Sequence, residues 1–481
     1  MRRLALLALL AAACDAPEDG RAAWLQTTLV LDNQVFLDTT PEQGAAKFAR
    51  MSLSRYAYFR GTLGQYARDT TQAGGAGYVP TAYASAETAD IALLGDPHPE
   101  NIGSFRGADG VLVVDYNDYD AATYGPFHFD VRRLALGLHL AGVELDVEDP
   151  QRLAAAAVAG YVDEIAALAG GSSGTVIAAG DDHGEILNHL LRKAAEDGLA
   201  REELSDYTRL ADGVRGMYFG AVEPPVPWAM SEYAMTLATD EVVPASAEEA
   251  ELVARILTAW PTTLHDPAVM PAPAAVIKGV SRRLGAGVAS FAAPRYYALL
   301  EGPSAALEDD VLLELKRVYD PPSLPGAVRL PGWAFADNGA RVVAQQRALQ
   351  SDAACDPLLG HASLGGVSYR VRDRSKYQRG VDLIKIAEKR AEGDFDDLDL
   401  EVLADRAGHL LAHAHARAPR QTGGPGLPGI AAALAQDPAG FIAETEAFVA
   451  VYAPVVEADY QRFLDILAAD GPSLGYTPAS P

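Results

Sequence analysis

The sequence predicts an α+β protein with a large helical part and a smaller β-rich part. Three observations lead to this prediction. Alanine-rich stretches such as 153–168 and 185–200 have the apolar periodicity of helices. Short apolar runs separated by turn signals predict β-structure at 102–114 and again at 274–318. The last quarter of the chain, from about residue 381, returns to a helical pattern.

Length, composition and charge narrow the possible classes of protein. With 481 residues, of which 49% are hydrophobic, the chain is long and apolar enough for a large core, and we expect two lobes. Its formal net charge of −26 would repel a phosphate backbone, so we expect no nucleic acid partner. No run of about 20 apolar residues follows the N-terminal segment, so no membrane-spanning helix is expected after it.

Residues 1–14 predict a bacterial signal peptide. The basic pair Arg2-Arg3 precedes a short apolar run, and the run ends in an Ala-Ala-Ala-Cys14 sequence that resembles a lipobox. A lipid anchor at Cys14 would make the mature protein a membrane-anchored lipoprotein of the cell envelope. The alternative is an ordinary apolar helix at the start of a cytoplasmic protein. With Cys14 lipidated, Cys355 has no cysteine partner, so no intrachain disulfide is expected.

Local patterns also predict the structure of the segments before and after residues 93–134. Residues 15–41 are expected to be a tether and entry segment. A helix is then expected to start at Thr40-Pro41, because threonine is a favourable N-cap and proline is favoured at the first helical position. The alanine-rich stretches predict that 149–260 is mostly helical.

Residues 93–134 hold the densest set of candidate site residues. A polar loop places Asp96, His98 and Asn101 close together in the sequence. Two β-like runs then predict a hairpin, and the second run ends in an acidic cluster that includes Asp115 and Asp118.

Phosphoryl transfer is the chemistry that this spacing predicts. The reaction needs a carboxylate that orients the attacking hydroxyl, and oxygen ligands that hold magnesium on the phosphates. Asp96 and Asn101 are five residues apart, which is the D-x-x-x-x-N spacing of a kinase catalytic loop. The alternative is a set of acidic residues that only cap helices and hairpins.

The same stretch resembles the protein-kinase-like and aminoglycoside phosphotransferase superfamily. More closely, the chain resembles the bacterial domain-of-unknown-function family 2252, which belongs to that superfamily. GDPHPEN at 95–101 matches the catalytic loop, and NDYD at 117–120 matches the N-D-F-D run. The resemblance implies that Asp96 is the catalytic aspartate and that His98 occupies a phosphate-contacting position.

The resemblance also implies the metal ligands. Asn101 and Asp118 correspond to the magnesium ligands, and the hairpin length leaves Asp115 as a rival of Asp118. Asp130 matches a residue that braces the catalytic loop through backbone contacts. Arg60, in an F-R-G motif, could contact an anion or pair with one of the aspartates of this region, and the alternative is a structural salt bridge.

The segment 274–318 predicts a strand, a small-residue loop and two further strands. Gly285, Gly287 and Ser290 belong to the loop, and Lys316 lies on the predicted strand 311–318. In the kinase-like pattern such a loop covers the nucleotide phosphates and the lysine pairs with them. Taken alone, the loop is better explained as a tight β-turn, and Ser290 stands where the pattern has a third glycine.

Two features of the later chain concern the candidate site: a departure from the kinase pattern, and a pair of histidines that could be mistaken for zinc ligands. The predicted helix 338–350 carries Gln345 and Gln346 where kinases have a glutamate that pairs with the strand lysine. In the last quarter, His413 and His415 are two residues apart and point to different helix faces, so they make a poor zinc pair. We expect His415 to pack or hydrogen-bond within the helical part.

The order of the motifs implies a circularly permuted, kinase-like, two-lobe fold, because the catalytic loop precedes the glycine loop. The expected divisions are 15–265 for the catalytic loop and helical lobe, 266–380 for the β-rich lobe, and 381–481 for helices that return to the helical lobe.

The main functional hypothesis is an ATP- and Mg²⁺-dependent phosphotransferase that acts on a hydroxyl of a small-molecule acceptor. One alternative is a non-catalytic, envelope-anchored binding protein on a kinase-like scaffold, because the extracytoplasmic space is not expected to supply ATP. A further alternative is a metal-dependent hydrolase that uses the acidic cluster without ATP.

Overall fold

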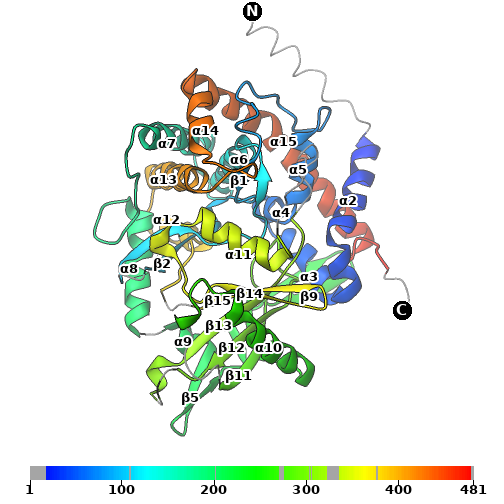
Figure 1. Ribbon diagram of the computed structural model, residues 1–481. Coiled ribbons are helices and arrows are strands. Elements are labelled where there is room, and N and C mark those ends of the chain that lie inside the picture. The colour runs from blue at the N-terminus through cyan, green and yellow to red at the C-terminus, as the bar shows by residue number, and fades with distance from the viewer. Residues whose placement is uncertain are drawn as a thin grey trace, which may run out of the picture.

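The computed structural model describes most of the chain. The described residues are 18–107, 110–200, 202–269, 276–302, 304, 306–321, 335–374 and 377–477. The predicted signal peptide and Cys14 lie outside them. Figure 1 shows most of the helices gathered at one end of the molecule and a large sheet at the other, with α11 between them. The class is therefore mixed α+β, as the sequence predicts.

The helical end contains segments from both halves of the chain. Its later helices (orange and red in Figure 1) lie beside its earlier ones. Its helices are α2 (Glu18–Thr39), α3 (Pro41–Met51), α4 (Arg55–Gly61), α5 (Leu63–Thr71), α6 (His128–Glu144), α7 (Gln151–Ala169), α8 (Glu185–Ala200), α12 (Leu383–Glu392), α13 (Asp397–Arg417), α14 (Leu427–Leu434) and α15 (Pro438–Asp470).

Glycines allow α7 and α13 to pack in close contact. A Cβ on Gly160 would lie 2.4 Å from the carbonyl oxygen of Asp405, and one on Gly408 would lie 2.0 Å from that of Ala157. Any larger residue would push the two helices apart. This close packing joins the returning C-terminal helices to the first half of the chain.

The N-terminal helices correct one expectation and confirm another. The described part of the segment expected to be a tether is not one, because α2 occupies Glu18–Thr39 and buries Leu25 and Leu29 in the core. Arg21 also pairs with buried Asp69 and Asp459, contacts that a local reading of the sequence does not reveal. The helix predicted at Thr40-Pro41 does begin at Pro41.

The large sheet has seven antiparallel strands in the order β14-β15-β13-β12-β11-β10-β7. Its strands are β7 (Gly220–Glu223), β10 (Asp240–Pro244), β11 (Ile277–Leu284), β12 (Arg295–Leu300), β13 (Val311–Val318), β14 (Gly360–Leu364) and β15 (Val367–Asp373). The expected strands at 295–300 and 311–318 are confirmed. Side chains alternate between the two faces of a strand, so Leu313 and Leu315 pack in an apolar cluster with α10 (Ala247–Ala259). Glu314 and Lys316 therefore lie on the opposite face.

The prediction that 149–260 is mostly helical is wrong for residues 208–244. That segment contains β5 (Thr208–Ala211), β6 (Val214–Met217), β8 (Val226–Met230) and β9 (Tyr233–Leu237) as well as β7 and β10. Asp212-Gly213 forms the two-residue turn of the first hairpin with φ of 51° and 77°. Asp-Gly is a strong hairpin signal that the helical periodicity of the flanking stretches obscured.

The remaining elements connect the two ends. The predicted hairpin at 102–114 is confirmed by the antiparallel pairing of β2 with β3. These elements are β1 (Ile91–Leu93), η1 (Pro99–Asn101), β2 (Ile102–Arg106), β3 (Leu112–Tyr116), β4 (Thr123–Gly125), α9 (Glu202–Tyr207), η2 (Trp260–Thr263), η3 (Pro267–Val269), η4 (Leu307–Asp309), α11 (Asn338–Leu349) and η5 (Asp352–Ala354).

Helix α15 is long and apolar enough to cross a membrane by length and composition alone. A core helix passes the same test, so this is weak evidence for a membrane span. In this structure Phe441, Phe448 and Phe463 of α15 are fully buried among the other helices.

Candidate functional site

We call residues 94–120 the acidic loop, and a sharp turn opens it directly after β1. Gly95 has a φ of +82°, and a Cβ there would lie 2.3 Å from the carbonyl oxygen of Ala121. Only glycine fits such a position. The carboxylate of Asp130, on α6, accepts hydrogen bonds from the backbone N–H groups of Leu94 at 2.7 Å and Gly95 at 3.1 Å. These bonds confirm the expectation that Asp130 braces the loop.

Asp130 is itself held by a buried chain of polar groups. Nε2 of His415 lies 3.3 Å from Asp130 Oδ2, and the hydroxyl of Tyr161 lies 2.9 Å from His415 Nδ1. His415 therefore hydrogen-bonds within the helical part, as expected, and links α13 to the acidic loop.

Asp96 and Asn101 are fixed with respect to each other and to α6. Asn101 Nδ2 donates to the backbone carbonyl of Asp96 at 2.8 Å, and Arg133 Nε donates to Asp96 Oδ1 at 2.8 Å. The Arg133 guanidinium also lies 3.5 Å from the ring centre of Phe59. Burial raises the pKa of Asp96 above its ordinary value, although Arg133 acts in the opposite direction.

His98 is buried and neutral. Burial, helped by the charge of Arg60, holds the pKa of His98 well below its ordinary value. Arg60 Nε lies 3.3 Å from His98 Nε2, and since an arginine can only donate, the imidazole proton is on Nδ1. Arg60 also forms an ion pair with Glu100, which matches the ion-pair alternative for this residue.

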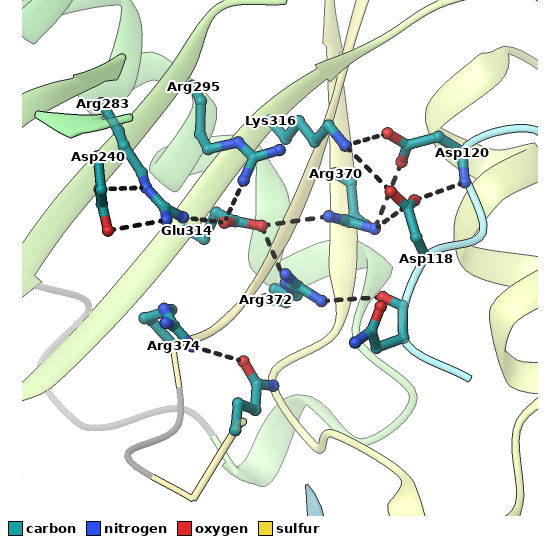
Figure 2. Close-up of polar contacts among 12 residues, drawn as sticks. Asp118, Asp120, Asp240, Arg283, Arg295, Glu314, Lys316, Arg370, Arg372 and Arg374 are labelled. Carbon is teal, nitrogen blue, oxygen red and sulfur yellow. Dashed lines mark hydrogen bonds and ion pairs between the residues drawn. The ribbon is translucent and has the colours of Figure 1, made fainter. Parts of the chain in front are cut away.

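Two aspartates of the acidic loop meet two cations of the sheet (Figure 2). Lys316 Nζ lies 3.5 Å from Asp118 Oδ2 and also contacts Asp120. Arg370 Nη1 lies 3.4 Å from Asp120 Oδ1. Burial would raise the pKa of Asp118, but Lys316 and Arg370 outweigh it and lower the pKa below its ordinary value.

Glu314 is the anionic centre of the charged sheet face (Figure 2). It accepts from Arg372 at 2.9 Å, Arg370 at 3.2 Å and Arg295 at 3.4 Å. Burial opposes the charge of Glu314, yet the arginines hold its pKa well below the ordinary value. Lys316 stands opposite both Arg295 and Arg370 across neighbouring strands. Like charges in these positions repel, and Glu314 offsets that repulsion.

Helix α11 attaches the acidic loop to the end of β13. Arg341 donates to the backbone carbonyls of Asp120 and Tyr319, each at 2.9 Å. No hydrogen bond among the described residues joins Lys316 to Gln345 or Gln346. Asp118 and Asp120, and not these glutamines, are the partners of Lys316 in the described chain.

The two sets of residues line one cleft of about 710 Å³. The predicted site residues that line it are Asp96, His98, Asn101, Asp118, Gly287, Ser290 and Lys316. They come from a loop near residue 100 and from strands and turns near residue 300. Figure 1 places these segments where the helical end meets the sheet.

One family model spans nearly all of this structure, from residue 39 to residue 466. The chain belongs to the DUF2252 family. The family is described as uncharacterized protein conserved in bacteria. No curated protein and no solved structure matches the chain.

In this DUF2252 chain, Asp115 and Gly285 do not line the cleft. Buried Asp115 accepts from the backbone N–H of Ser351 at 2.8 Å and faces Arg417 at 3.7 Å. Asp115 therefore points away from Lys316, and Asp118 takes the position next to it. Gly285 has a φ of +80°, and a Cβ there would lie 2.3 Å from the Ala238 carbonyl, so its role is to turn the chain.

Several residues of the site were not predicted. Asp120, Arg133 and Arg370 contact the predicted residues Lys316, Asp96 and Asp118, and Glu314 contacts Arg370. The R-V-R-D-R sequence at 370–374 was the available signal, because arginine at every second position of a strand places all of them on one face.

The oxygen donors of the DUF2252 site suit a hard cation bound together with phosphates. Asp118, Asp120 and Asn101 all line the cleft. Nδ2 of Asn101 is engaged by the Asp96 carbonyl, which leaves its Oδ1 as an acceptor. Among the described residues no three His, Cys, Asp or Glu side chains are grouped as a protein-only metal site would require. Mg²⁺ is often held by one or two carboxylates together with substrate phosphates, which this arrangement can supply.

Proposed function

We propose that this protein is an ATP- and Mg²⁺-dependent phosphotransferase that acts on a hydroxyl of a small-molecule acceptor. One observation carries the proposal. Asp96 and Asp118 of the early acidic loop and Lys316 of the late sheet line the same cleft. Phosphoryl transfer depends on positioning and on neutralising charge, and the cleft combines an acidic and a cationic wall for these tasks.

In this proposal Asp96 orients the acceptor hydroxyl. Arg133 and the Asn101 amide fix the Asp96 side chain and backbone, so its carboxylate has a defined direction. Burial raises the pKa of Asp96, which makes the carboxylate a better proton acceptor than an exposed aspartate. His98 supports Arg60 and the loop through its neutral ring.

Asn101, Asp118 and Asp120 would hold Mg²⁺. When bound, Mg²⁺ would supply the positive charge that neutralises the negative charge developing on the phosphates. Lys316, Arg370 and the loop 287–290 would contact the phosphates from the other wall. Because Gly287 has a φ of +77° and no close neighbour at its Cβ position, the backbone there can approach a ligand closely.

Metal and nucleotide are expected to bind together. Without ligands, Lys316 and Arg370 neutralise Asp118 and Asp120. A nucleotide alone would take the cations and leave the aspartates unpaired, and a metal alone would do the reverse. The Mg²⁺–nucleotide complex satisfies both walls at once, so each component should strengthen binding of the other.

The proposal includes a kinase-like, two-lobe architecture that is circularly permuted. The acidic loop precedes the charged sheet in the chain, and α13 returns from the C-terminal quarter to pack on α7. Both facts support the permuted order.

Thermal-shift assays and ATP-consumption assays test the function. Mg²⁺ with ATP should raise the melting temperature of the wild type. With a pool of hydroxyl-bearing metabolites as acceptors, Asp96→Asn should abolish ATP consumption and keep the thermal shift. Absence of any shift over a wide concentration range would contradict the proposal. Unchanged consumption in the variant would contradict the role of Asp96.

The second candidate is a non-catalytic, envelope-anchored binding protein on the same scaffold. One observation favours it: no glutamate of α11 pairs with Lys316, whose ion partners in the described chain are Asp118 and Asp120. A nucleotide-induced thermal shift without ATP consumption for any acceptor would support this candidate over the first.

A further inference from the structure

A buried lysine lines the cleft on the helical side, away from the charged sheet face. Lys47 lies on α3, and 4% of the residue is exposed. Its ammonium group donates to Oδ1 of Asn33, which also lines the cleft. Asn33 is held in turn, because its Nδ2 donates to the Leu29 carbonyl at 2.8 Å. The ammonium also lies 5.5 Å from the ring centre of Phe36.

No carboxylate of the described residues lies within ion-pair distance of Lys47. Asp32 is the charged group that acts on it most, and Asp32 is already paired with Arg68 through two hydrogen bonds. Burial therefore lowers the pKa of Lys47 to about 8. By contrast, the buried cations of the sheet wall, Lys316 and Arg370, each have anionic partners.

An unpaired cation in such a position is costly for the ligand-free protein. A buried charge without a counter-ion destabilises a protein. An apolar residue of similar size in the same place usually does not. The cost is explained if a ligand supplies the missing anion. The surroundings of Lys47 are consistent with a bound ligand. Phe36, beside its ammonium group, packs with Ala292, Ala293 and Tyr319, next to the loop 287–290.

We propose that Lys47, oriented by Asn33, is the counter-ion for a phosphate or carboxylate group of a ligand bound in this cleft. The inference rests on the proposed function only in treating the cleft as the ligand site. Two sources could supply the anion: the phosphates of the nucleotide or an anionic group on the acceptor. The test below distinguishes them.

The test compares Lys47→Met with Lys278→Met by calorimetry and thermal melting. Lys278 is the matched control, since it is a partly buried lysine paired with Asp310 at 2.9 Å and lies outside the cleft lining. Lys278→Met should destabilise the protein and leave anion binding unchanged. Lys47→Met should keep or raise the ligand-free melting temperature and weaken anion binding by roughly ten- to a hundredfold, the range for a charged hydrogen bond.

Two probes separate the sources of the anion. The first is Mg²⁺ with a non-hydrolysable ATP analogue, and the second is inorganic phosphate added after the analogue has saturated the cleft. Weaker binding of the analogue in Lys47→Met assigns Lys47 to the nucleotide. Weaker binding of phosphate alone assigns it to the acceptor.

Two results would overturn the inference. One is wild-type affinity of Lys47→Met for both probes while the analogue still binds, which leaves the proposed function standing. The other is binding of neither probe to the wild type, which contradicts the proposed function as well. Competitive acetylation of lysines gives a second readout: a bound probe should protect Lys47 and leave exposed Lys193 unchanged, and a purely structural lysine would show no such protection.

Discussion

The two walls of the cleft are built by different means. The acidic loop is fixed mainly by hydrogen bonds of its own backbone: Leu94 and Gly95 donate to the Asp130 carboxylate, and the Asp96 carbonyl accepts from Asn101. The sheet wall is fixed by charge, since arginines from three strands converge on one buried glutamate. The first wall thus depends on local geometry, and the second depends on a balance of charges brought together by the fold.

This contrast predicts that the sheet wall is the more sensitive to loss of one side chain. Glu314→Ala would leave several buried arginines without their shared anion. Removing one partner of a buried ion pair usually costs about 3–5 kcal/mol of unfolding free energy, and we expect a loss of that size in chemical denaturation. Exposed Glu196→Ala, which removes a surface pair with Lys193, should change little. Equal stability of Glu314→Ala and wild type would contradict the central role of Glu314.

The acidic loop should respond to loss of its brace with a smaller change. Asp130→Ala would leave two backbone N–H groups and His415 without their acceptor. We expect a loss of about 3 kcal/mol in unfolding free energy, since each of the three unsatisfied groups costs about 1 kcal/mol at the low end of the usual range. Asp130→Asn keeps one acceptor oxygen and should lose less. If both variants had the melting temperature of the wild type, the Asp130 brace would not be needed for stability.

Acid should weaken the sheet wall through Glu314. The pKa of Glu314 is held well below its ordinary value of 4.5, so the folded state binds fewer protons than the unfolded chain as the pH falls below that value. The stability that Glu314 confers is present above about pH 4.5 and is lost as the pH falls toward its folded pKa. In Glu314→Gln the slope of unfolding free energy against pH should decrease by up to about 1.4 kcal/mol per pH unit. An unchanged acid profile would show that Glu314 does not carry this dependence.

The smallest effect is expected at the loop that joins β11 to β12. Gly287→Ala places a Cβ in ordinary contact with Ser290 but at a φ of +77°, so we expect a loss of about 1 kcal/mol in stability. Gly216→Ala, on β6 with nothing near its Cβ and no positive φ, is the matched control and should not show this loss. Equal melting temperatures for the two variants would indicate that the backbone at Gly287 relaxes.

The sequence predicted elements well where local patterns were strong. The strands at 295–300 and 311–318 were predicted with their observed bounds, because apolar runs and turn signals marked them. Helix α2 was missed, since its burial depends on distant partners such as Asp459. The hairpins at 208–237 were missed although Asp212-Gly213 marked the first of them.

In the candidate site, too, local motifs could be predicted and contacts between distant segments could not. The loop residues Asp96, Asn101 and Asp118 form one contiguous motif, so they could be proposed from the sequence. The direction in which Asp115 points, toward Ser351, depends on the packing of α11 and could not be predicted. The contacts of Asp120 with Lys316 and of Glu314 with the arginines join residues far apart in the chain, or depend on strand register. Register is a property of the whole sheet and could not be deduced from single motifs.

Calorimetric titration tests the account's central claim most directly: one ligand is bound by both walls. A non-hydrolysable ATP analogue would be titrated with and without Mg²⁺ into wild type, Asp118→Asn and Lys316→Met. We expect binding to the wild type that weakens about tenfold or more without Mg²⁺ and in each variant, because each wall contributes a charged contact. If the wild type failed to bind the analogue, or if neither substitution changed its affinity, the claim that both walls bind one ligand would be contradicted.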